Sequence, residues 1–103
     1  MMSDIKQART ALVTRILEGT GYASRDQRSA AFHNEGLAGP VSTLIDKVAR
    51  CSYKVTDEDI AAAKAAGLSE DQIFELAVCA AVGQAARQYD TALAALAAAA
   101  NEG

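Results

Sequence analysis

The stretch VTDEDIAAAKAAGLSEDQI, residues 55–73, contains two successive helix starts, and it decides the fold class. Thr56 and Ser69 are hydroxyl residues of the kind that caps a helix by accepting a hydrogen bond from a free backbone N–H. Each cap has an apolar residue just before it and another four residues after it, which is the pattern of a hydrophobic staple. Two such signatures about 13 residues apart, with Gly67 between them, predict a short helix, a tight turn and a new helix.

Helical patterns continue on both sides of this stretch. The chain has one proline, and no segment shows the sustained period-two alternation of a strand. Ser3 and Ser24 occupy further cap positions. In the first helix an apolar face at helical spacing contains Ile5, Ala8, Leu12, Val13, Ile16 and Leu17, and Arg9 is expected to point away from it. The predicted helices cover residues 4–18, 25–34, 40–52, 57–66 and 70–100. The sequence therefore predicts an all-α fold, a small helical bundle with a long alanine-rich C-terminal helix whose end, residues 97–103, frays.

The long C-terminal helix is expected to be apolar on two faces. Ile73, Leu76 and Ala80 fall on one face at helical spacing, and a second apolar face runs towards Leu96. Small residues in its middle, such as Gly83, Ala85 and Ala86, would permit another backbone to approach closely. A helix of this kind needs neighbours on two sides.

The composition indicates a thin hydrophobic core. Half of the residues are apolar, but many of these are alanine, and the aromatic residues are three Tyr and two Phe with no Trp. Alanine buries little area per side chain, so a chain of this length does not easily bury enough surface alone. We therefore expect a homo-oligomer.

The charge and hydropathy exclude several classes of partner. A net charge of −3 argues against a nucleic-acid platform and against docking on anionic lipid. No run approaches the length of an apolar membrane span, and the first residues lack the apolar core of a signal peptide. We expect a cytoplasmic protein with free thiols at Cys51 and Cys79, without nucleic-acid or membrane partners.

Residues 44–96 resemble the carboxymuconolactone decarboxylase and alkylhydroperoxidase D-like family. The motifs that carry the resemblance are VTDEDI at residues 55–60 and AGLSEDQIFELAV at residues 66–78. The resemblance implies an alkylhydroperoxidase D-like helical bundle in one domain, residues 1–103, with divergent helices over 1–40 and a family-like core over 41–100. It also implies a homo-oligomer, often a trimer or a multiple of trimers.

The peroxidase branch of that family places its chemistry on a C-x-x-C pair, with a Glu before it and a His after it. This sequence contains no C-x-x-C, because Cys51 and Cys79 are 28 positions apart. No catalytic residue is therefore carried over from the family to this chain.

The candidate site residues are Cys51, Cys79, His33 and Glu75, and each also has a structural interpretation. The two cysteines form a redox pair only if the fold brings them together, and Cys79 lies in an apolar run typical of an inert buried thiol. His33 is the only histidine, but no nucleophile stands near it in the sequence. Glu75 belongs with Arg87 and Asp90 to a set of charges that interrupts the long helix, where ion pairing is the commoner role.

Neither a metal nor a cofactor is expected. Asp57, Glu58 and Asp59 are consecutive on a helix and spread around its axis, so helix capping explains them without a cation.

Three functions remain open from the sequence. The first is an assembly or binding module with an unknown ligand, which could be a small molecule. The second is a small decarboxylase-like enzyme with a site at a subunit interface, built from His33, Tyr53, Glu75 or Arg87. The third is a thiol-dependent peroxidase that uses Cys51 and Cys79.

Overall fold

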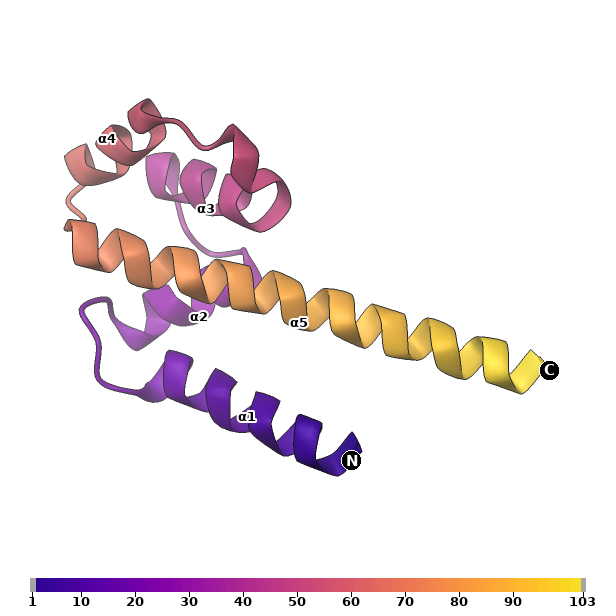
Figure 1. The fold of residues 1–103 in the computed structure, drawn as a ribbon. Coiled ribbons are helices and arrows are strands. Elements are labelled where there is room, and N and C mark those ends of the chain that lie inside the picture. The colour runs from indigo at the N-terminus through magenta and orange to yellow at the C-terminus, as the bar shows by residue number, and fades with distance from the viewer. Residues whose placement is uncertain (1, 103) are drawn as a thin grey trace.

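The computed structural model describes the backbone of residues 2–102 and the side chains of residues 6–101, and in this part of the chain loops connect helices and no strand is present (Figure 1). The elements in order are α1 (Met2–Glu18), α2 (Arg25–His33), α3 (Gly39–Cys51), a short 3-10 helix η1 (Ser52–Lys54), α4 (Asp57–Ala65) and α5 (Glu70–Glu102). The all-α prediction is confirmed, and so is the long C-terminal helix.

Both helix starts of residues 55–73 form as the sequence predicts. Thr56 Oγ1 accepts a hydrogen bond from Asp59 N at 3.2 Å, and Asp59 returns one by accepting from Thr56 N at 2.9 Å. Ser69 Oγ accepts from Gln72 N at 3.1 Å, and Gln72 Oε1 accepts from Ser69 N at 2.8 Å. Gly67 between them has a φ of 111°, a conformation that L side chains rarely adopt. The turn between α4 and α5 therefore forms at Gly67, as the sequence predicts.

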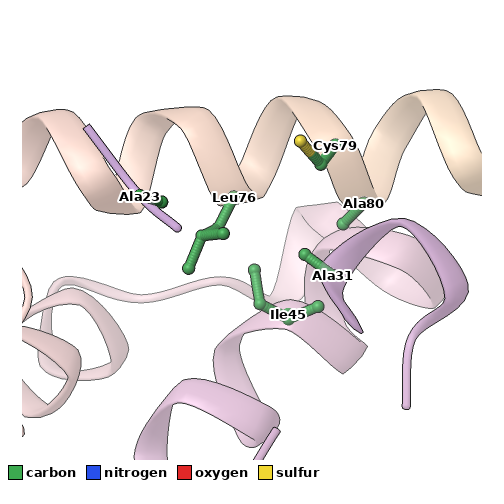
Figure 2. Packing of buried hydrophobic residues seen from close by; sticks show 6 residues of the cluster. All are labelled: Ala23, Ala31, Ile45, Leu76, Cys79 and Ala80. Carbon is green, nitrogen blue, oxygen red and sulfur yellow. The ribbon is translucent and has the colours of Figure 1, made fainter. Parts of the chain in front are cut away.

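α5 is the central element, and α2, α3 and α4 pack along its first half (Figure 1). One buried cluster joins α5 to α2, α3 and the loop before α2, and Figure 2 shows its six members: Ala23, Ala31, Ile45, Leu76, Cys79 and Ala80. A second cluster joins α3, α4 and α5 through Leu44, Ala63 and Ile73. Four of these nine residues are alanine, so the core is as thin as the composition predicts.

α2 approaches α5 closely at Gly83. A Cβ atom built on Gly83 would overlap the backbone carbonyl of Phe32 in α2. Arg87, one turn further along α5, donates from Nη1 to the same carbonyl oxygen at 2.6 Å. Gly83 and Ala86 are buried as expected, whereas Ala85 is exposed and takes no part in this contact.

α1 differs from its prediction in three ways. The helix begins at Met2, so Ser3 lies inside it and does not cap it. Arg9 faces α5, where its two terminal nitrogens bind the Asp90 carboxylate at 2.6 and 2.9 Å. Leu12, assigned to the buried face, is 51% exposed, and the side chain of Ile5 lies outside the described residues. α1 is oriented by the salt bridge to Asp90, which the apolar pattern of one helix cannot reveal.

The second half of α5 projects beyond the rest of the bundle, towards the C-terminus in Figure 1. The helix continues to Glu102, so the prediction that residues 97–103 fray is wrong for residues 97–102, and Gly103 lies outside the described residues. The radius of gyration is 15.7 Å, against about 13 Å for a compact domain of this length. The long alanine run explains the difference, because alanine has the highest helix propensity and keeps the helix continuous without packing partners.

Candidate functional site

A pocket of about 670 Å³ opens between α1, α2 and the first half of α5. Four apolar side chains line it, namely Leu12, Ile16, Phe74 and Val78. Four ionisable residues also line it, namely Arg15, Arg28, Glu75 and Cys79. The pocket therefore combines an apolar wall with a small set of charged groups, which is the usual make-up of a small-molecule site.

Arg28 is the charged residue buried most deeply at this pocket. Its side chain is 5% exposed, and Nη1 donates to the carbonyl oxygens of Ile16 at 3.0 Å and Gly19 at 2.6 Å. These bonds satisfy carbonyls at the C-terminal end of α1, where a cation also interacts favourably with the helix dipole. Nε of the same guanidinium is buried and has no hydrogen-bond partner among the described residues.

Glu75 connects α5 to the loop that precedes α2. Its carboxylate accepts hydrogen bonds from the backbone N–H groups of Tyr22 and Ala23, the latter at 3.2 Å. A Cβ on Gly21 would collide with the same carboxylate, so the loop passes close over it. The salt bridges among the described residues do not include one between Glu75 and Arg28, although both line the pocket. Glu75 thus has a clear structural role beside its place in the pocket wall.

Cys79 lies on the α5 side of the pocket and is 1% exposed. Burial raises the pKa of its thiol, Glu75 adds to the rise, and Arg28 opposes it. A raised pKa keeps the thiol protonated near neutral pH, where it is a poor nucleophile. The expectation that Cys79 is a buried thiol is confirmed.

The other sequence candidates do not join this pocket. Cys51 is the last residue of α3, half-buried, and both its thiol and that of Cys79 are free. His33 is exposed at the end of α2, with its ring 5.0 Å from that of Phe32 in an edge-on contact, and it borders only a shallow depression. Tyr53 is 83% exposed on η1. The chain therefore brings Glu75 and Cys79 together and leaves His33, Cys51 and Tyr53 outside.

Arg87 and Asp90 of α5 each contact a neighbouring helix and do not bind each other. Arg87 binds Phe32 O and Gln84 Oε1, while Asp90 binds Arg9 of α1. Arg87 and Asp90 are three positions apart on α5 and could pair with each other, but the structure gives each of them other partners. The guanidinium of Arg9 lowers the pKa of the Asp90 carboxyl.

Sequence reasoning did not find Arg28, the residue that gives the pocket its buried charge. One signal was present, because Arg28 stands three residues before Ala31 and four before Phe32. Residues at this spacing share one helix face, and Ala31 is fully buried in the core. A charged residue on the buried face of a short polar helix indicates either a structural cap or a binding group.

Two further properties concern residues 2–102 as a whole. Among the described side chains, residues 6–101, no group of three or more His, Cys, Asp or Glu converges in a way that could hold a metal ion. None of the described helices combines the length and the apolar character needed to cross a membrane.

Comparisons with known proteins add no assignment to this geometry. No family model, no curated protein and no solved structure matches the chain. The resemblance of residues 44–96 to the carboxymuconolactone decarboxylase family thus stays a prediction from the motifs.

Proposed function

We propose that this protein is a homo-oligomeric assembly module whose subunits join through the projecting part of α5. The α5 arm is defined here as residues 91–101, TALAALAAAAN. The resemblance to the carboxymuconolactone decarboxylase family supports a trimer or a multiple of trimers as the order of the oligomer.

The observation that carries this proposal is the exposure of an apolar helix. The α5 arm contains seven alanines, two leucines and no charged residue. Every residue in it is exposed except Leu93, which is half-buried, and Leu96 is 67% exposed. A helix that is apolar on all sides is normally buried against other helices. Its small side chains allow a second helix to approach to about 8 Å between axes.

The surface area supports the same conclusion independently. The accessible surface of the chain is 6841 Å², whereas a folded monomer of its mass exposes about 5,500 Å². The excess, roughly 1,300 Å², exceeds the approximately 800 Å² that each partner buries in a standard interface. The exposed α5 arm contributes to this excess, and covering it would lower the exposed area per subunit.

The two enzymatic hypotheses have less support. Peroxide reduction requires a thiolate and a resolving thiol, and here the pKa of Cys79 is raised while Cys51 lies outside the pocket. A decarboxylase-like site would need His33 and Tyr53, which are exposed and apart from the pocket, to be completed by another subunit.

Light scattering coupled to size exclusion tests the proposal at micromolar concentration. The wild-type protein should elute at a multiple of 10.7 kDa, and Leu96→Glu should shift the mass towards that of one chain. Tyr53→Glu is the matched control, because it places the same charge on another exposed apolar residue away from the arm. A wild-type mass of 10.7 kDa, or equal behaviour of the two variants, would refute the proposal.

A further inference from the structure

We propose that the pocket between α1, α2 and α5 binds a small carboxylate with an apolar body, with its head group on Arg28. This inference goes beyond the assembly function and depends on a different part of the molecule. On α5 the pocket residues are Phe74, Glu75, Val78 and Cys79, more than ten positions before the α5 arm.

The free edge of the Arg28 guanidinium defines the head group. Both hydrogen bonds to the end of α1 leave from Nη1, and Nε is buried without a partner among the described residues. An arginine binds a carboxylate in bidentate fashion through two parallel N–H groups, and one such pair is Nε with Nη2. Leaving a buried donor unpaired costs free energy that a ligand oxygen would recover. Nε and Nη2 are thus the pair of donors on Arg28 that matches the two oxygens of a carboxylate.

The apolar wall defines the body of the ligand. Leu12 and Phe74 are 51% and 70% exposed, which is unusual for large apolar side chains beside a cavity. With Ile16 and Val78 they are the large apolar side chains that line the same pocket as Arg28. A pocket of about 670 Å³ lies within the range of small-molecule sites, so an aliphatic chain or a single ring would fit.

The balance of charges favours an anion over a cation. Arg15 and Arg28 face the pocket from α1 and α2, and Glu75 is the one carboxylate that lines it. Glu75 already accepts hydrogen bonds from the backbone of Tyr22 and Ala23, which disperse its charge. The thiol of Cys79 is held protonated by burial and contributes no charge. A ligand with an ammonium group would therefore lie near two arginines of the same charge, whereas a carboxylate could accept a hydrogen bond from the unpaired Nε of Arg28.

Calorimetric titration of the full chain with octanoate tests the inference. Octanoate should bind at one site per chain with a Kd of about 1 mM or tighter, as expected for a ligand of this size. Octanol and octylammonium carry the same chain with a neutral and a positive head group, and both should bind at least about tenfold more weakly. No saturable octanoate binding would overturn the proposal. So would equal binding of octanol, which needs no arginine, or of octylammonium, which would indicate Glu75.

Variants separate the head group from the body of the ligand. Arg28→Gln should lower octanoate affinity at least about tenfold, while Arg25→Gln, which removes the same charge from an exposed position of α2 outside the pocket lining, should change it by less than about threefold. Because Arg28 also caps α1, Val78→Phe provides a second variant that fills the pocket and leaves Arg28 in place. It should abolish octanoate binding while the circular dichroism spectrum stays helical. Retained octanoate affinity in folded Val78→Phe, or equal effects of the two arginine variants, would overturn the assignment.

Discussion

Gly83→Ala is expected to destabilise the protein, although alanine is the better helix former. A Cβ at this position would lie 2.7 Å from the carbonyl carbon of Phe32 and 3.0 Å from its Cα, and it would overlap the carbonyl oxygen. Normal carbon–carbon contact begins near 3.5 Å. The obstacle is backbone and not a flexible side chain, so α2 as a whole must move away from α5 by about 1 Å.

The expected change in the free energy of unfolding combines two destabilising effects and one stabilising effect. Overfilling a packed contact costs about 1–3 kcal/mol. Moving α2 also weakens the hydrogen bond from Arg87 to Phe32 O, a bond to a charged group that contributes about 1.5–3 kcal/mol. The higher helix propensity of alanine relative to glycine stabilises the variant by about 1 kcal/mol and offsets part of this loss. The expected net loss is about 2–4 kcal/mol, which lowers the melting temperature by roughly 10–20 °C for a chain of this size.

Urea unfolding followed by circular dichroism provides the measurement, at one fixed protein concentration because oligomers unfold in a concentration-dependent way. Gln88→Gly is the control, since Gln88 is exposed on the same helix and reports helix propensity alone, with an expected loss of about 0.5–1 kcal/mol. If Gly83→Ala is as stable as the wild type or more stable, the close approach of α2 to α5 is not real.

Three further predictions concern acid stability, the loop before α2 and peroxide chemistry. Hydrogen bonds from Lys47, Lys64 and Arg9 lower the pKa of three carboxyls below their ordinary values of 3.8 for Asp and 4.5 for Glu, namely Asp59, Glu70 and Asp90. Their contribution to stability is therefore complete above those values and is lost as the pH falls below about 4, so the urea midpoint should be level from pH 5 to 7 and decrease at pH 3. Glu75→Ala should cost about 2–3 kcal/mol because two backbone N–H groups lose a charged acceptor, whereas exposed Asp71→Ala should cost much less, and equal losses in urea unfolding would contradict the role of Glu75. A reductant-coupled assay should detect no turnover of alkyl hydroperoxide, and turnover that disappears in both Cys51→Ser and Cys79→Ser would show that the thiols cooperate.

The elements of the fold were predictable because they depend on local interactions. A cap such as Ser69 with Gln72 involves neighbours in sequence, and the structure places both hydrogen bonds where the pattern indicates. The buried positions of the first half of α5 follow from helical spacing in the same way. Helix starts and core faces could therefore be assigned from residue order alone.

The sequence named Glu75 and Cys79 as candidates, but the assembly of the pocket around them could not be predicted, because its parts come from three helices. Glu75 meets the N–H groups of Tyr22 and Ala23 across more than 50 positions of sequence. Arg28 approaches Ile16 and Gly19 only because the loop between α1 and α2 reverses the chain. Such contacts depend on the relative placement of helices, and a single sequence contains no periodicity that encodes it.

The attachment of α1 has a consequence for how the protein opens. α1 is held by polar links at Arg9 and Arg28, and among its described side chains, residues 6–18, Ile16 alone packs against the buried cluster around Leu76. A unit with little buried apolar area separates at a lower free energy than the core, so the amide hydrogens of α1 should exchange with deuterium faster than those of residues 73–83. α1 also forms one wall of the pocket, so each such opening would expose Arg28 and Cys79 to solvent. Fluctuation of this one helix, and not a fixed channel, would then set the rate at which a molecule enters or leaves.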